Sequence, residues 1–91
     1  MNIFLETRIK EFFLNESSFH MRLLEASLNL STVRNVYEAE AEKLDLAVWE
    51  VKLIVKAGSY SAAAASLTAA HFELAEMLEM SWEDYSFIAF K

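Results

Sequence analysis

The sequence predicts an all-α protein, a compact bundle of four to five helices. Three observations favour helices. The 91 residues include no proline and one glycine, so the residues that tight hairpins and long loops need are missing. Apolar residues recur at intervals of three and four along most of the chain. The polar clusters that could end a helix are few and far apart. We therefore expect one helical domain over residues 1–91.

The first half of the chain predicts two helices before its first long break. The first covers residues 3–14, where apolar residues recur at helical spacing: Leu5, Ile9, Phe12 and Phe13. The second runs from about Ser18 to Leu28, and its apolar side holds Phe19, Leu23, Ala26 and Leu30. The polar stretch 29–32 either separates this helix from the next or only bends one long rod.

The third helix is predicted over residues 32–57, capped by Ser31 or Thr32. Its apolar positions step by three or four: Val33, Tyr37, Ala41, Leu44, Val48, Val51 and Val55. Gly58 follows where a left-handed helix end is wanted. Ser59 or Ser61 then begins a fourth helix that reaches about residue 80. The segments 32–57 and 60–80 should form an antiparallel hairpin.

A short final helix is predicted over residues 82–90. Ser81, followed three residues later by Asp84, is a variant of the capping box. The segment 81–91 is rich in aromatic residues.

Charge is distributed unevenly along this acidic chain, whose net charge is −6. Residues 1–56 hold nine acids against seven Lys or Arg, whereas residues 57–91 hold five acids against Lys91 alone. Nucleic acids are bound mainly through Lys and Arg, so no nucleic-acid partner is expected. No apolar run is long enough to cross a membrane, and charges at 6, 8, 10 and 11 interrupt any secretory signal. With no cysteine in the chain, a cytoplasmic location fits.

The stretch GSYSAAAASL at residues 58–67 resembles the start of the DNA-binding segment in LysR-type regulators. That resemblance implies a helix-turn-helix, with the turn near Thr68 and a recognition helix after it. The sequence departs from the family there, because Thr68 replaces the usual glycine and residues 69–80 hold three glutamates and no Lys or Arg.

Two further helical families resemble the same region. Ala63, Leu67 and Ala70 match the spacing in the second helix of a tetratricopeptide repeat, although the first half of that motif is missing. The run from Ala41 to Leu78 resembles the helical hairpin of HEPN domains, but lacks the Arg and His pair of the RNase members. What the three families share is a pair of packed antiparallel helices, not an activity.

The sequence predicts no catalytic, metal or cofactor site. His71 has Glu73 and Glu76 near it in sequence, but neither shares its helix face. Glu16 and His20 are four residues apart and could pair, although one such pair is too common to indicate a metal. The acidic stripes at residues 38–45 and 73–79 are typical of a solvated helix face.

Docking surfaces are the most specific functional expectation. Apolar residues make up 55% of the chain, more than so small a domain can bury alone. We predict partner contacts at a second apolar stripe of the third helix and in the aromatic tail: Leu46, Trp49, Leu53, Trp82, Tyr85, Phe87, Ile88 and Phe90. The alternative is that the tail closes the protein's own core.

The predicted function is non-enzymatic protein–protein interaction by a self-associating protein. This describes a small regulator, inhibitor or adaptor of bacterial or phage type. Two alternatives stay open at this point. One is a helix-turn-helix regulator, and the other is an oligomer that holds a small ligand, such as a nucleotide, between its subunits.

Overall fold

The computed structural model describes residues 3–27 and 29–90, and these form six α-helices without a strand. The predicted all-α fold class is confirmed. The helices are α1 (Ile3–Leu14), α2 (Glu16–Ala26), α3 (Leu30–Leu44), α4 (Val48–Ala57), α5 (Tyr60–Met77) and α6 (Trp82–Ala89).

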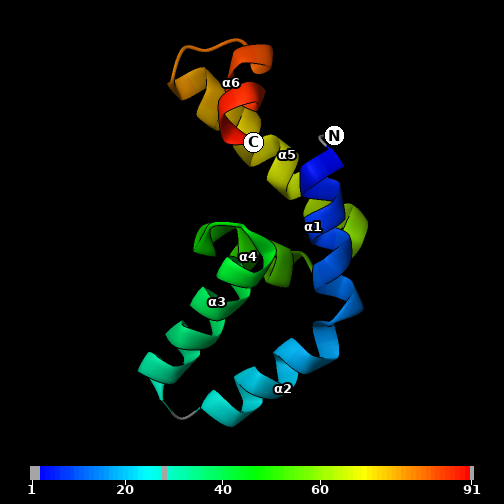
Figure 1. Ribbon diagram of the computed structural model, residues 1–91, viewed down its shortest axis with the longest axis vertical. Coiled ribbons are helices and arrows are strands. Elements are labelled where there is room, and N and C mark those ends of the chain that lie inside the picture. Colours follow the sequence, from blue (N-terminus) through cyan, green and yellow to red (C-terminus); the bar gives the residue numbers. More distant parts are fainter. Residues whose placement is uncertain (1–2, 28, 91) are drawn as a thin grey trace.

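The molecule is elongated, with extents of 43 × 24 × 20 Å. Figure 1 shows α5 rising from the middle of the molecule to one end, where α6 packs against its second half. Helices α2 and α3 form the opposite end, and α1 packs on α5 and α3. The predicted hairpin is formed by α4 and α5, which make the most extensive helix–helix contact.

The core runs along the inner faces of these helices. Phe12 and Phe19 are fully buried, and their rings meet edge to face at 5.3 Å. On α5, residues four apart face inward together because that spacing keeps them on one side of the helix. These inward residues are Ala63, Leu67, His71 and Ala75. His71 is therefore held inside the protein by the same periodicity that buries its apolar neighbours.

The prediction of one helix over residues 32–57 was wrong, because the chain turns between α3 and α4. Asp45 takes a left-handed conformation with φ 55°, and the N–H of Leu46 donates to the carbonyl of Ala41 at 2.9 Å. This is a Schellman motif, which ends a helix by satisfying its last carbonyls. Glu50 then starts α4 by accepting a hydrogen bond from the Ala47 N–H at 3.0 Å.

The boundary between α2 and α3 is a real break, not a bend. Asn29 caps α3, since its side chain accepts a hydrogen bond from the N–H of Thr32 at 3.2 Å. The predicted caps, Ser31 and Thr32, lie inside that helix. Helix α2 starts at Glu16, earlier than predicted, and Leu30 is exposed instead of sharing its apolar side. The predicted end at Leu28 lies outside the described residues.

The predicted helix boundaries at Gly58, Ser59 and Ser81 are confirmed, whereas α5 ends at Met77, before the predicted residue 80. Gly58 has φ 77° at the end of α4, and the Ser59 hydroxyl accepts from the N–H of Ala62. Ser81 likewise accepts from the N–H of Asp84 at the start of α6. A second Schellman motif ends α5, where Glu79 has φ 55° and the N–H of Met80 donates to the Ala75 carbonyl at 3.0 Å.

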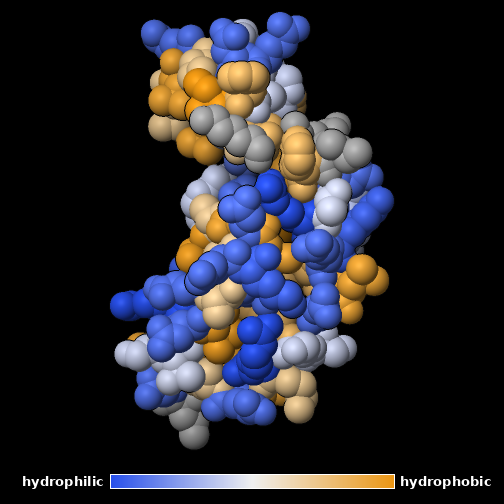
Figure 2. Space-filling view, viewed as in Figure 1, coloured by the Kyte–Doolittle hydropathy of each residue, from blue (hydrophilic) through white to orange (hydrophobic). Residues whose placement is uncertain are grey.

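Large apolar side chains are exposed at both ends of the molecule. Figure 2 shows hydrophobic surface gathered around α6, while hydrophilic residues dominate the middle of the same face. The helices of residues 3–27 and 29–90 include none that combines the length and hydrophobicity needed to span a bilayer.

Candidate functional site

Three buried polar side chains from three helices meet in the upper part of the molecule. The His71 ring of α5 is 5% exposed, and it lies between Glu50 of α4 and Tyr85 of α6. The Nε2 atom of His71 is 2.8 Å from Oε2 of Glu50, and its Nδ1 atom is 2.5 Å from the Tyr85 hydroxyl. We call Glu50, His71 and Tyr85 the polar array. It links α4, α5 and α6 through side chains alone.

The hydrogens in the polar array can be assigned for an ionised Glu50 and a neutral His71. An ionised carboxylate only accepts, so Nε2 of His71 donates to Glu50. Nδ1 then accepts from the Tyr85 O–H, and the second carboxylate oxygen of Glu50 accepts from the Ala47 N–H. Each of these polar groups is thereby paired. Buried groups paired in this way stabilise a specific arrangement, whereas an unpaired one would cost stability.

Aromatic rings enclose the polar array. The His71 ring lies 4.9 Å from the Phe90 ring and 5.3 Å from the Trp49 ring, measured between centroids. Trp82 stacks on Tyr85 at 5.6 Å and on Phe72 at 4.1 Å. These rings keep water away from the hydrogen bonds and fix the position of α6.

The surroundings of Tyr85 favour its neutral, protonated form. Burial, together with the nearby Glu50 carboxylate, raises the pKa of the Tyr85 hydroxyl above its ordinary value of 10.0. A tyrosine used as a nucleophile or base needs a lowered pKa and an accessible oxygen. Tyr85 is buried, so its environment favours a hydroxyl that keeps its proton and donates to His71.

A partly buried ion pair joins α2 to α3. Nη2 of Arg22 lies 2.7 Å from Oε2 of Glu40, which is almost fully buried. The other carboxylate oxygen of Glu40 is buried with no hydrogen-bond partner among the described residues. Among the described residues, the charge that compensates the burial of this carboxylate is that of Arg22.

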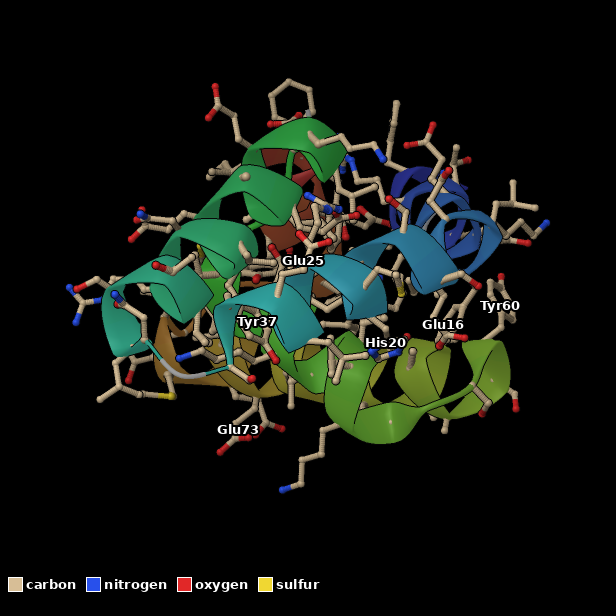
Figure 3. The ribbon with its side chains drawn as sticks, turned by 90° about the horizontal axis from the view of Figure 1, so that it is seen from below. Glu16, His20, Glu25, Tyr37, Tyr60 and Glu73 are labelled. Atoms are coloured by element: carbon tan, nitrogen blue, oxygen red, sulfur yellow. The ribbon has the colours of Figure 1, made fainter. Side chains whose placement is uncertain are left out.

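The Glu16 and His20 pair is exposed on the surface of α2. The two side chains lie on successive turns, with Nε2 of His20 3.7 Å from Oε2 of Glu16 (Figure 3). Across residues 3–27 and 29–90, no three His, Asp or Glu side chains come close enough together to hold a metal ion. This pair is therefore a surface contact between two side chains.

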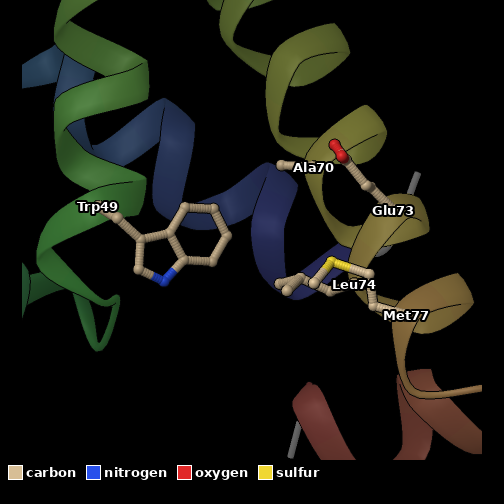
Figure 4. Close-up of a pocket in the computed structure, with 5 residues that line it drawn as sticks. All are labelled: Trp49, Ala70, Glu73, Leu74 and Met77. Atoms are coloured by element: carbon tan, nitrogen blue, oxygen red, sulfur yellow. The ribbon is translucent and has the colours of Figure 1, made fainter.

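Beside the polar array, an open groove lies between α4 and α5. Its volume is about 360 Å³, and its lining residues are Trp49, Ala70, Glu73, Leu74 and Met77. Figure 4 shows the Trp49 ring facing α5 across the groove, with Leu74 and Met77 opposite and the Glu73 carboxylate beside Ala70. The groove is apolar, with one charged side chain at its edge.

The structure divides the predicted docking residues into three groups. Tyr85 and Phe90, two of the predicted docking residues, are buried and pack within the chain's own core. Leu46, Leu53 and Trp82 are half-buried and packed against that core. Trp49, Phe87 and Ile88 are free to meet a partner, with exposures of 39%, 80% and 59%.

Sequence patterns gave no signal for the polar array. Glu50 and Tyr85 are 21 and 14 residues from His71, so local spacing could not pair them. The turn that the resemblance to LysR-type regulators implies near Thr68 is not formed, since α5 continues without interruption through that residue. Phe72, Met77 and Leu78 on and just after α5 are exposed as well.

These observations define a class of protein: a small all-α bundle with an internal polar array and exposed apolar side chains at its ends. The chain belongs to a family of unknown function, DUF6388, whose family model matches residues 5–89. The matched region extends from the first helix to the end of the last, and so includes the polar array and the groove. No curated protein and no solved structure matches the chain.

Proposed function

We propose that this protein acts by binding other protein surfaces and does not itself catalyse a reaction. The supporting observation is an excess of exposed surface, together with the large apolar side chains that lie exposed on it. The chain exposes 6065 Å², whereas a monomeric protein of its mass exposes about 5,400 Å². The difference, about 700 Å², is close to the roughly 800 Å² that each partner buries in a standard interface.

The exposed apolar side chains fall into two groups, and the parts of the chain that carry them differ in net charge. At the α1–α3 end they are Leu14, Met21, Leu24 and Leu30. Residues 1–56 are nearly balanced in charge, so a second copy of the chain could pack there without strong repulsion. We therefore assign self-association to the α1–α3 end. A regulator or adaptor that dimerises at one end keeps its other end free for a second protein.

A cytoplasmic location belongs to the same proposal. An acidic chain without cysteine fits a reducing compartment, and an acidic surface around apolar patches limits non-specific association.

Light scattering after size exclusion tests self-association. We expect the mass of a dimer that falls toward the monomer on dilution. The double variant Met21→Ser/Leu24→Ser, which changes two exposed residues of α2, should be monomeric. Phe87→Ser/Ile88→Ser, a matched change at the α6 end, should leave the dimer intact. If the protein is a monomer at all concentrations, the proposed self-association is wrong.

A small ligand held between subunits is the second candidate function. The groove supports it only weakly, because its volume is near the lower end of ligand pockets, about 300–1,000 Å³, and it is open to solvent. Its lining also lacks the set of convergent polar groups that orient a small molecule. Native mass spectrometry of the purified protein would reveal a retained ligand.

A further inference from the structure

The groove between α4 and α5 has the lining of a peptide-binding surface. Met77 is 72% exposed and lies across from the Trp49 ring, with Ala70 and Leu74 between them (Figure 4). Methionine is unbranched and polarisable, so it adapts its shape to apolar side chains placed against it. Ala70 presents only a methyl group, which leaves room for a side chain from outside.

Negative charge surrounds this groove on the α5 side. Glu73 lines it, and Glu76 lies three residues further along the same helix. All five acids between residues 57 and 91 are exposed. On α4, the first lysine after Trp49 is Lys52, an exposed residue about one turn further along the helix. A partner would therefore meet acids along α5 and a positive charge only toward the end of α4.

This distribution of charge disfavours a second copy of the chain as the occupant. A symmetric contact places the same patch of both copies face to face. Here it would bring the acidic residues of one α5 and α6 near those of the other, and like charges across an interface are repulsive. The charge that complements Glu73 and Glu76 is positive.

We propose that the groove binds a basic amphipathic helix of another protein. Two large apolar side chains of that helix, three or four residues apart, would insert between Trp49 and Met77. Lys or Arg residues beside them would face Glu73 and Glu76. This inference rests on the proposed function, since it names the kind of partner that the free end of the molecule accepts.

A display library of randomised 18-residue helical peptides, selected on the full chain, tests the proposal. We expect the enriched peptides to combine an apolar stripe with a net positive charge. Their binding should be lost with Met77→Asp, a change at an exposed position that leaves the core untouched. The circular dichroism of that variant should match the parent protein.

Two charge-reversal variants separate the role of Glu73 from a general attraction between the acidic protein and a basic peptide. Glu73→Lys should weaken a selected peptide by about tenfold at low salt, with a smaller effect at high salt. Glu38→Lys makes the same change of charge at an exposed site on α3, and should have little effect.

Two results would overturn the inference in different ways. If enriched peptides are neutral or acidic but still need Met77, the groove is a docking surface for another chemistry, and only the basic partner is wrong. If no peptide binds the parent protein better than it binds the Met77→Asp variant, the groove does not bind helices. The proposed function then loses its support at this end of the molecule.

Discussion

The Nε2 atom of His71 lies 2.8 Å from a carboxylate oxygen of Glu50, deep between α4 and α5. The pair holds the beginning of α4 against the second half of α5, and Tyr85 extends the connection to α6. The groove with its exposed Trp49 and Met77 is built on these same helices. The polar array thus fixes the surface that we propose as a docking site.

His71→Leu should destabilise the protein by about 3 kcal/mol, because it leaves the Glu50 carboxylate and the Tyr85 hydroxyl buried without a partner. Urea unfolding followed by circular dichroism measures this loss. The double variant Glu50→Leu/His71→Leu should recover part of the stability, since no charge then stays unpaired. A loss below about 1 kcal/mol for the single change would contradict the role of the polar array.

Tyr85→Phe should alter the response of stability to alkaline pH. The folded protein holds the pKa of Tyr85 above 10.0, so the unfolded chain loses this proton first as the pH rises. The contribution of Tyr85 to the free energy of unfolding is complete below pH 10. It is lost as the pH rises through the higher pKa of the folded protein. Between pH 9 and pH 11 the variant should therefore lose less stability than the parent chain. If the stability of the two proteins falls equally with pH in this range, the titration of Tyr85 does not contribute to the loss.

Arg22→Met should cost about 3 kcal/mol, because it leaves the Glu40 carboxylate buried without compensation. Lys10→Met is the matched control. It breaks the exposed 3.3 Å pair between Lys10 and Glu6, and such surface pairs contribute less than about 1 kcal/mol. Thermal or urea unfolding of both variants measures the difference. Equal effects would mean that burial of Glu40 carries no particular cost.

Glu79→Gly should stabilise the protein by about 1 kcal/mol. Glu79 has φ 55°, a conformation that glycine adopts without the steric cost of a Cβ atom. Glu73→Gly, the same change at an exposed position further inside α5, should instead destabilise by about 1 kcal/mol, because glycine weakens a helix interior. The two unfolding midpoints should move in opposite directions, and a shift in the same direction would refute the assignment at Glu79.

The sequence predicted the helical class and most helix ends because those depend on local chemistry. Gly58, Ser59 and Ser81 act within one turn of their own positions, and each lies where expected. Asp45 was missed because a non-glycine residue in a left-handed conformation carries little local signal. The polar array depends on three helices meeting, so His71 showed no partner in its own stretch. For the same reason, the aromatic tail could not be divided into buried Tyr85 and exposed Phe87 before the position of α6 was known.

Our proposal requires that the exposed apolar side chains meet another protein in the cell. Site-specific photo-crosslinking tests it most directly, with a benzoylphenylalanine residue at position 77 or 87 in cells that naturally express the chain. Both positions are exposed, so the substitution should leave the fold intact, and Ser61 near the start of α5 serves as an exposed control site. We predict a discrete adduct heavier than the monomer from positions 77 and 87, and none from position 61. Adducts absent from all three positions, or equally abundant at each, would contradict the account.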